Sequence, residues 1–359
     1  LGAKKAPLAV TLTLDDTAVL QYTGGTTGVS KGAQLLHKNL VANMMQVREL
    51  IVHILDGDRE IMIAPLPLYH IYAFTVSLVM SDMGHEMVLI PNPRDIPGFV
   101  KELSKHNFTS FAGLNTLFVA LCNNKEFNAL DFSHLKHTIS GGMALTEAAA
   151  GTWQQVTGCQ IQEAYGLTET SPAVSFNPYH DIRIGTIGKV VTGTEVKVIA
   201  EDGTDVGFNQ EGELCVKGPQ VMAGYWQRPE ATAEVIDADG WFKTGDVAIL
   251  AEDGFIRLVD RIKDMIIVSG FNVYPNEIDD IASQHPGILE CAAVGVPHEV
   301  SGETVKLFVV KSDPSLTAAD VIAHCREHLT AYKVPKEVEF KDDLPKTNVG
   351  KILRRALRD

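Results

Sequence analysis

A segment near the start of the chain, YTGGTTGVSKG from Tyr22 to Gly32, has a composition suited to binding phosphate groups. Glycines let backbone N–H groups turn inward around an anion, while hydroxyls and an ammonium group supply further donors. The spacing differs from the P-loop pattern, because Val29 and Ser30 stand where that pattern needs its second glycine. An exposed Gly/Thr turn is the alternative interpretation. The residues predicted to cradle the polyphosphate of ATP are Thr23, Gly24, Gly25, Thr26, Thr27, Gly28 and Lys31.

The patterns on either side of this loop predict how it is held. The apolar run Ala18 to Leu20 predicts a strand before the loop, and the residues from Leu35 to Leu50 predict a helix after it. We therefore expect the loop to lie where a strand passes into the N-terminus of a helix, a position that favours anions.

Two further segments combine glycines or polar groups with predicted strand ends, where open α/β sheets bind ligands. In the first, the predicted strand 138–140 is followed by Gly141, Gly142 and Met143, and the two glycines permit close approach of a flat ligand. A plain strand-to-helix turn explains this segment equally well. In the second, Tyr165 offers a ring that can stack on a base, and Glu169 offers a carboxylate to a hard cation such as Mg²⁺.

Other polar residues carry weaker signals. Asp246, in the sequence WFKTGD, has a carboxylate that can accept two hydrogen bonds from a ribose diol, although a turn aspartate is the commoner case. The alternating charges of 260–264 favour surface salt bridges. From sequence neighbours alone, Lys351 reads as an ordinary basic residue and His70 as a packed histidine.

Composition excludes some classes of protein. The chain has 359 residues and a formal net charge of −14, which argues against a nucleic-acid-binding protein. The five cysteines are scattered, which predicts neither a disulfide framework nor a zinc site and favours a reducing, cytoplasmic setting. The longest apolar run, 71–80, is too short to span a membrane. From Lys346 onward five basic residues face one acid, a pattern that fits either a solvated helix or contact with phosphates or an anionic membrane surface.

The chain divides into three regions with different sequence patterns. Up to about residue 178, short apolar runs alternate with helical patterns, which predicts an α/β fold with a parallel sheet. From 184 to 261, β-type runs joined by Asp202-Gly203 and Asp253-Gly254 predict an antiparallel subdomain. From 263 onward, alternating strands and helices, ending in a basic helix, predict a small α+β domain. We therefore divide the chain into a large domain, 1–262, and a small C-terminal domain, 263–359.

In this order and spacing, the segments resemble the adenylate-forming (AMP-binding) superfamily, which includes acyl-CoA ligases, luciferases and the adenylation domains of peptide synthetases. Three segments look most like bacterial long-chain fatty acyl-CoA ligases: GLNTLF at 113–118, FNVYPNE at 271–277 and LPKTNVGKILRR at 344–355. Members of the superfamily carry, before the phosphate loop, a segment that completes the sheets of the large domain, whereas this chain has 21 residues before Tyr22-Thr23. We expect the chain to be a fragment whose large domain lacks its N-terminal portion.

The resemblance implies a role for each matching residue. Thr23 and Glu169 would bind Mg²⁺, Thr23 to Lys31 would bind the β- and γ-phosphates, and Asp246 with Arg261 would hold the ribose. His70 would border the substrate carboxylate, and Lys351 would neutralise charge at the α-phosphate. Lys263 matches the hinge between the domains, and Gly270 would line the pantetheine tunnel. The residues placed around adenine or within the same nucleotide motif are Gly141, Gly142, Met143, Tyr165, Gly166 and Thr168.

The implied reaction joins a fatty acid to AMP, releases pyrophosphate, and then passes the acyl group to the thiol of CoA. The implied partners are the fatty acid, ATP, Mg²⁺ and CoA, with peripheral contact at the inner membrane surface, no nucleic acid, and no signal for chain length or oligomeric state. Three alternatives remain open. They are a serine hydrolase, because Gly28 to Gly32 fits G-x-S-x-G, an inactive nucleotide-binding remnant, and a ligase that uses another acid or a carrier protein.

Overall fold

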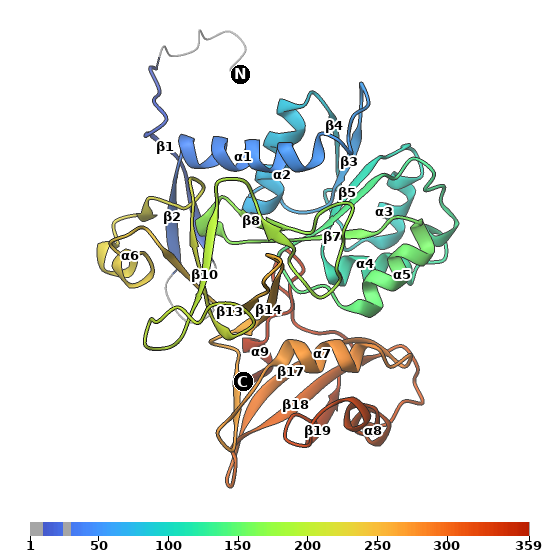
Figure 1. The fold of residues 1–359 in the computed structure, drawn as a ribbon. Coiled ribbons are helices and arrows are strands. Elements are labelled where there is room, and N and C mark those ends of the chain that lie inside the picture. The colour runs from blue at the N-terminus through green and yellow to red at the C-terminus, as the bar shows by residue number, and fades with distance from the viewer. Residues whose placement is uncertain (1–9, 24–29, 359) are drawn as a thin grey trace.

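The structure is a computed structural model that describes residues 10–23 and 30–358. Figure 1 shows a larger upper body formed by the chain up to β14 and a smaller lower body that contains β17, β18, β19, α7 and α8. The end of the chain returns to the junction of the two bodies, where α9 lies.

A seven-stranded sheet forms the centre of the upper body, with the strand order β4-β3-β5-β6-β7-β8-β9. Neighbours from β4 to β7 are parallel, and β8 and β9 are added antiparallel at the end. The predicted parallel sheet is confirmed, and its short, wholly buried strands β5 and β6 are typical of sheets covered on both faces. The strands are β3 (Ile61–Ala64), β4 (Glu86–Leu89), β5 (Ser110–Gly113), β6 (His137–Ser140), β7 (Ile161–Gly166), β8 (Ala173–Phe176) and β9 (Lys189–Val190).

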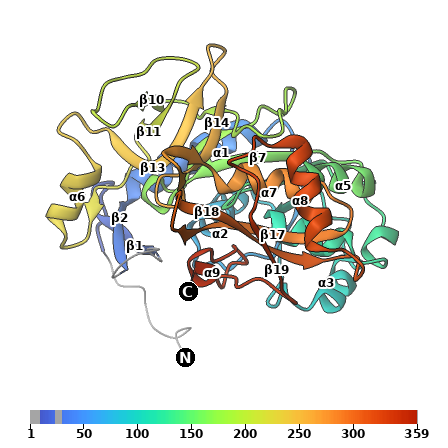
Figure 2. The same ribbon diagram turned by 90° about the horizontal axis from the view of Figure 1, so that it is seen from below.

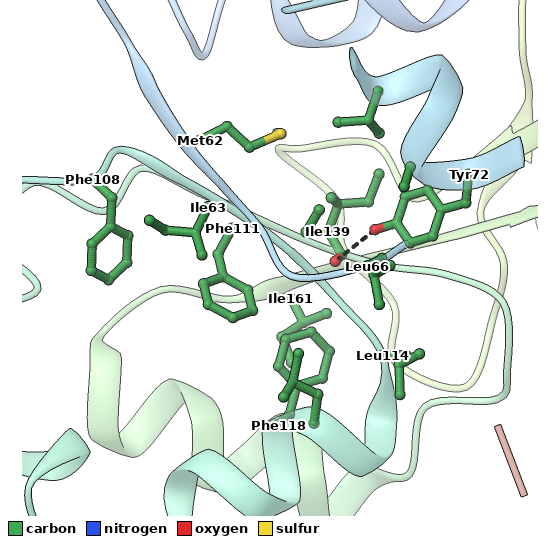
Figure 3. Close-up of a cluster of buried hydrophobic side chains, with 14 of the residues drawn as sticks. Met62, Ile63, Leu66, Tyr72, Phe108, Phe111, Leu114, Phe118, Ile139 and Ile161 are labelled. Atoms are coloured by element: carbon green, nitrogen blue, oxygen red, sulfur yellow. Dashed lines mark hydrogen bonds between the residues drawn. The ribbon is translucent and has the colours of Figure 1, made fainter. Parts of the chain in front are cut away.

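Helices between these strands bury apolar side chains against the sheet. Phe111 of β5 packs against Trp153 of α5 with ring centroids 5.2 Å apart, and Trp153 contacts Phe118 of α4 at 4.8 Å. Figure 3 shows Phe111 and Phe118 in this core, next to Ile63 and Ile161 of neighbouring strands. The helices are α1 (His37–Ile51), α2 (Ile71–Asp82), α3 (Ile96–Leu103), α4 (Asn115–Cys122) and α5 (Glu147–Thr157), with 3₁₀ turns η1 (Phe127–Ala129) and η2 (Thr168–Thr170).

The predicted position of the phosphate loop is wrong. Strand β1 (Thr17–Thr23) pairs antiparallel with β2 (Lys31–Leu36), and β2 also pairs with β12 (Gly224–Tyr225). The loop therefore connects two strands of a hairpin, and α1 begins only at His37. The prediction failed because Leu35, which lies with Ala33 on the buried face of β2, was read as the start of the following helix.

The predicted antiparallel subdomain is confirmed as a four-stranded sheet in the order β10-β11-β13-β14. Asp202-Gly203 lies between β10 and β11, and Asp253-Gly254 lies between β13 and β14, as expected for turn residues. Its strands are β10 (Glu195–Ile199), β11 (Glu211–Lys217), β13 (Phe242–Leu250) and β14 (Ile256–Arg261), and the short helix α6 (Pro229–Val235) precedes β13.

The lower body has its own five-stranded sheet, which Figure 2 shows from below. Its central strands, β17 and β18, are buried on both faces. Cys291 and Ala293 of β17 belong to the cluster under α7 and α8, whereas Ala292 and Val294 between them belong to a cluster that includes Leu344 and Leu357. The elements are β15 (Ile266–Val268), β16 (Phe271–Val273), α7 (Pro275–Ser283), β17 (Ile288–His298), β18 (Gly302–Lys311), α8 (Ala318–His328), β19 (Glu337–Phe340) and α9 (Arg355–Arg358).

The end of the chain differs from the basic helix that the sequence predicted. Only Arg355–Arg358 is helical, and the residues before it form a turn closed by an isolated bridge between Lys346 and Ile352. The apolar residues Leu344, Ile352 and Leu357 pack on the second face of the sheet, which holds this segment against the lower body. Within the described part of the chain, no helix combines the length and the apolar character that a membrane span requires.

Candidate active site

A cavity of about 1420 Å³ lies where the upper and lower bodies meet. Its lining includes residues from β7, β14 and α7, and the turn that ends at Lys351. The predicted site residues that line it are Gly142, Met143, Tyr165, Gly166, Asp246, Arg261 and Lys351. The fold therefore brings together residues that are up to 209 positions apart in the sequence, from Gly142 to Lys351.

Three of these residues, Tyr165 on β7 and Asp246 and Arg261 on the paired strands β13 and β14, form one connected polar group. The Tyr165 hydroxyl donates to Asp246 Oδ2 at 2.5 Å, and Arg261 Nε lies 3.3 Å from Asp246 Oδ1. Asp246 and Arg261 are direct partners in the β13–β14 ladder, which fixes their spacing. Burial and the neighbouring Asp246 carboxylate raise the pKa of Tyr165 well above its usual value, so its hydroxyl stays protonated. Each carboxylate oxygen of Asp246 keeps a second lone pair for a further donor.

Two glycine positions of the cavity wall depend on the absence of a side chain. At Gly166, an added Cβ would lie 2.0 Å from the carbonyl oxygen of Pro172, so only glycine fits. Gly142 has φ +84°, which glycine adopts without strain. Beside them, the Tyr72 ring lies within 3.6 Å of the position that a Cβ of Gly141 would take. The Tyr72 hydroxyl donates to the Ile139 carbonyl at 3.2 Å, as Figure 3 shows, which fixes the ring next to the end of β6.

The predicted phosphate-binding residues Gly24, Gly25, Thr26, Thr27 and Gly28 lie outside the described residues. Thr23 and Lys31, which flank them, are partners at the ends of β1 and β2. The turn η2, which carries Thr168 and Glu169, packs against both strands. The loop ends and Glu169 therefore lie in one region.

Tyr225 links the two sides of this region. Its hydroxyl donates to Glu169 Oε1 at 2.7 Å, and Lys31 Nζ lies 4.9 Å from the centre of its ring, close enough for a cation–π contact. Among the described residues no cluster of three His, Cys, Asp or Glu side chains is placed to hold a metal ion. One carboxylate and a hydroxyl instead suit Mg²⁺, which is commonly held by one or two protein carboxylates together with substrate phosphates.

His70 lies at the start of α2, where its Nδ1 accepts a hydrogen bond from the backbone N–H of Tyr72 at 3.3 Å. With Nδ1 acting as an acceptor, the proton of the neutral ring is on Nε2. Burial and, to a lesser extent, the positive charge of Lys351 lower the pKa of His70. The neutral ring therefore offers its Nε2–H as a hydrogen-bond donor, and the Lys351 ammonium is near enough for its charge to act on the ring.

Lys351 is presented by the turn at residues 347–350. The Gly350 N–H donates to the Thr347 carbonyl at 2.9 Å, and the Lys351 N–H donates to Thr347 Oγ1 at 3.2 Å. Burial and the Arg261 charge lower the pKa of Lys351 to about 8, against the opposing influence of Asp246. The pocket therefore destabilises the ammonium form of Lys351, and a bound anion would stabilise that form and raise its pKa.

Arg354 anchors the base of this turn. Its Nη2 lies 2.6 Å from Asp279 Oδ2 and 2.8 Å from Asn276 Oδ1, both on α7. Burial raises the pKa of Asp279 to about 6 even though Arg354 opposes that shift. This buried pair fixes the turn to the lower body, three residues from Lys351.

Two predicted positions lie elsewhere. Gly270 is exposed in the turn between β15 and β16, with φ +84°, and does not line the cavity. Ser30 is exposed and leads into strand β2, whereas a nucleophile elbow needs its serine between a strand and a helix. The serine hydrolase interpretation is therefore unsupported.

Two site residues escaped the sequence analysis. Glu163 is 94% buried in the cavity wall, and its Oε2 has no hydrogen-bond partner within the described structure. Burial raises the pKa of Glu163 to about 8. It precedes Tyr165 by two residues and so shares its face of β7, a signal that the alternation of strand residues offered. Tyr225 had no such signal, because the pairing of β12 with β2 is a long-range contact.

Residues 2–226 match the AMP-binding enzyme family, and residues 277–351 match the AMP-binding enzyme C-terminal domain. The chain is 57% identical over 347 residues to a long-chain-fatty-acid–CoA ligase of Escherichia coli O6:H1, covering 96% of this chain and 62% of that protein. It is 36% identical to a feruloyl-CoA synthase of Amycolatopsis, covering 99% of this chain and 72% of that protein.

Solved structures agree with this fold. ATP-bound MatB from Rhodopseudomonas palustris superposes with a TM-score of 0.89 at 33% identity, covering 98% of this chain and 70% of that chain. Apo MatB from the same organism gives a TM-score of 0.76 with the same coverage. The chain thus spans about 62% of the length of the bacterial ligases that it matches.

Proposed function

Because this chain belongs to the AMP-binding enzyme family, we propose that the whole protein activates a long-chain fatty acid with ATP and passes the acyl group to CoA. The observation that carries the proposal is the meeting of Lys351 and the Tyr165–Asp246–Arg261 group around one cavity, with His70 near enough to Lys351 for the lysine charge to lower the His70 pKa. The 57% identity to a fatty-acid ligase supports this substrate over an aromatic acid, for which the relative above is 36% identical.

In the first step, a carboxylate oxygen attacks the α-phosphorus of ATP and pyrophosphate leaves. Negative charge builds up between the carboxylate and the phosphate, where the Lys351 ammonium stabilises it. His70 donates from Nε2 to the second carboxylate oxygen and orients it for in-line attack. In the second step, the CoA thiolate attacks the acyl carbon of the adenylate, and AMP leaves with the former acid oxygen.

The nucleotide fits the polar groups of the cavity wall. Asp246 would accept hydrogen bonds from the ribose hydroxyls while Tyr165 and Arg261 hold the carboxylate in place. Adenine would lie between the Tyr165 ring and the backbone of Gly141 to Met143. Glu163 would supply its unpartnered Oε2 to the amino group of adenine, which compensates for its burial.

Thr23, Lys31 and Thr168 would contact the phosphates, and Thr23 with Glu169 would hold Mg²⁺. The ion would supply positive charge next to the leaving pyrophosphate. Tyr225 holds one oxygen of Glu169 and leaves the other to face the ion.

The second step needs a different arrangement of the lower body, because Gly270 lies away from the cavity here. We propose that residues 263–359 move as a small domain about the turn at 261–264, in which the Asp264 N–H donates to the Arg261 carbonyl. Rotation there would withdraw Lys351 and bring Gly270 towards the pantetheine arm of CoA. The better superposition on ATP-bound than on apo MatB supports assigning the present arrangement to the first step.

A cytoplasmic location with peripheral membrane contact stays a prediction. The basic residues near the end of the chain offer it little support, because Lys346, Arg354 and Arg358 form ion pairs with Glu290, Asp279 and Asp264. Co-sedimentation with vesicles of anionic lipid would measure such contact directly.

The proposed function is tested with the protein as its gene encodes it and a panel of carboxylic acids. Pyrophosphate release that depends on a long-chain acid, followed by AMP release that depends on CoA, would support it. Pyrophosphate release with aromatic or short-chain acids alone would show that the substrate is not a long-chain fatty acid. Tight ATP binding without any pyrophosphate exchange would indicate an inactive remnant, and AMP release with an acylated carrier protein instead of CoA would change the acceptor.

A further inference from the structure

The turn that presents Lys351 is held from outside the lower body. Thr116, near the start of α4, donates a hydrogen bond from its hydroxyl to the carbonyl oxygen of Gly350 at 3.0 Å. Arg94, before α3, reaches the other end of the turn, where its Nη2 lies 3.3 Å from the carbonyl oxygen of Thr347. Both donors belong to the upper body, and both acceptors belong to the four residues that precede Lys351.

We propose that Thr116 is a positioning residue for the first chemical step. By binding the turn at 347–350, Thr116 holds that turn in the cavity and so fixes the position of the Lys351 ammonium. The expected effect of Thr116 on the first chemical step rests on the proposed function. The contact between Thr116 and Gly350 does not depend on it. Thr116 acts through Gly350 and does not touch the reacting atoms.

The surroundings of the bond favour this role. Thr116 is 8% exposed and Gly350 is partly buried, so water has less access to the Gly350 carbonyl than it would have at an open surface. Gly350 has φ +86°, and a Cβ at that position would lie 3.6 Å from both Thr116 Oγ1 and Leu114 Cδ1, so the turn packs directly on the start of α4. By contrast, Arg94 is exposed and its hydrogen bond to Thr347 is longer. We therefore expect the Thr116 hydrogen bond to contribute more than the Arg94 hydrogen bond to holding the turn.

A hydrogen bond that crosses between the bodies must break when the lower body rotates. The Thr116 bond is made only while Lys351 is in the cavity, so it favours the first-step arrangement and contributes nothing to thioester formation. Asp280 of α7 makes a further contact of this kind, accepting from the Glu147 N–H at the start of α5 at 3.1 Å. The Asp280–Glu147 contact links α7 to α5, whereas Thr116 contacts the turn at 347–350 that carries Lys351.

The test compares Thr116→Val, which keeps the shape and removes the hydroxyl, with Thr116→Ser, which keeps the hydroxyl. In the protein as its gene encodes it, Thr116→Val should lower the kcat of acid-dependent pyrophosphate exchange by about 3- to 10-fold, the range for one neutral hydrogen bond. The KM for ATP and the conversion of a pre-made acyl adenylate to acyl-CoA should stay at the parental values. Thr116→Ser should restore most of the exchange rate.

A second measurement keeps the proposal separate from the proposed function. Trypsin cleavage after Lys351, followed by mass spectrometry without ligands, reports how often the turn leaves the cavity. Cleavage should be faster in Thr116→Val than in the parent and Thr116→Ser, with the thermal midpoint within a few degrees of the parent. Equal cleavage and equal exchange in all three proteins would overturn the proposal, as would equal loss of both half-reactions. Faster cleavage without any pyrophosphate exchange in the parent would uphold the contact and reject the proposed function.

Discussion

The pH dependence of the first half-reaction provides a direct test of the site. In the proposed first step Lys351 would act only as an ammonium ion, and burial lowers its pKa to about 8. Arg261 and Arg354 add to this shift, whereas Asp246 and Asp264 oppose it. Since a lysine is charged below its pKa, the contribution is present at pH 7 and is lost as the pH rises through 8.

The expected size follows from that pKa. With a pKa of about 8, the ammonium fraction is about 90% at pH 7 and about 10% at pH 9, a tenfold fall. The kcat/KM for ATP reports groups of the free enzyme and should show the whole of this fall, with its midpoint near pH 8. The kcat reports the bound complex, in which the phosphates of ATP favour the ammonium, so its decline should begin at a higher pH.

The assay is acid-dependent pyrophosphate exchange at saturating Mg²⁺ from pH 6.5 to 9.5. Glu163 needs a matched control, because burial raises its pKa to about 8 as well and it loses its proton over the same range. Glu163→Gln mimics the protonated acid, so the decline should persist in that variant. It should vanish in Lys351→Ala, whose residual activity has no ammonium to lose. A flat kcat/KM profile in the parent, or a profile that flattens in Glu163→Gln, would refute the assignment to Lys351.

Three further predictions concern the groups around the nucleotide and the lysine turn. Asp246→Asn should raise the KM for ATP by about 10- to 100-fold, the range for hydrogen bonds to a charged group, and steady-state kinetics with an unchanged KM would remove Asp246 from the ribose site. Glu169→Gln should raise the Mg²⁺ concentration for half-maximal exchange by at least about tenfold, since the ion would lose its protein carboxylate, and an unchanged Mg²⁺ titration would contradict this. Arg354→Met should lower the free energy of unfolding by about 3–5 kcal/mol, because Asp279 is left buried without its partner, and urea denaturation should show recovery in the double variant with Asp279→Asn.

Local patterns predicted the elements of this fold better than their connections. The predicted strand 138–140 matches β6, and the turns predicted at Asp202-Gly203 and Asp253-Gly254 join β10 to β11 and β13 to β14, because each signal is complete within a few residues. The phosphate loop shows the limit of such patterns. Whether Lys31 to Leu36 forms a strand depends on pairing with β1 and β12, and the second partner is about 190 residues away.

The sequence indicated a role for a site residue only where its neighbours in the sequence already carry the relevant chemistry. The glycine and threonine density of the phosphate loop, and the pairing of Tyr165 with Glu169, carry their chemistry locally. Lys351 does not. Its neighbours Gly350 and Ile352 are ordinary, and the resemblance to a family, rather than any feature of the segment, gave it a role.

The structure explains why Lys351 has no local signal. Its pKa is lowered by burial and by the charges of Arg261 on β14 and Arg354 beside the turn, and the turn that carries it accepts a hydrogen bond from Thr116 on α4. These contacts exist only when the two bodies meet in this arrangement. If the lower body moves as proposed, it carries a lysine with no local signal that gains its role only on entering the cavity. The burial that lowers its pKa also strengthens its attraction to phosphate, so bound anions would stabilise the ammonium. In the proposed reaction, that attraction would weaken once pyrophosphate has left, which would favour release of the turn before CoA reacts.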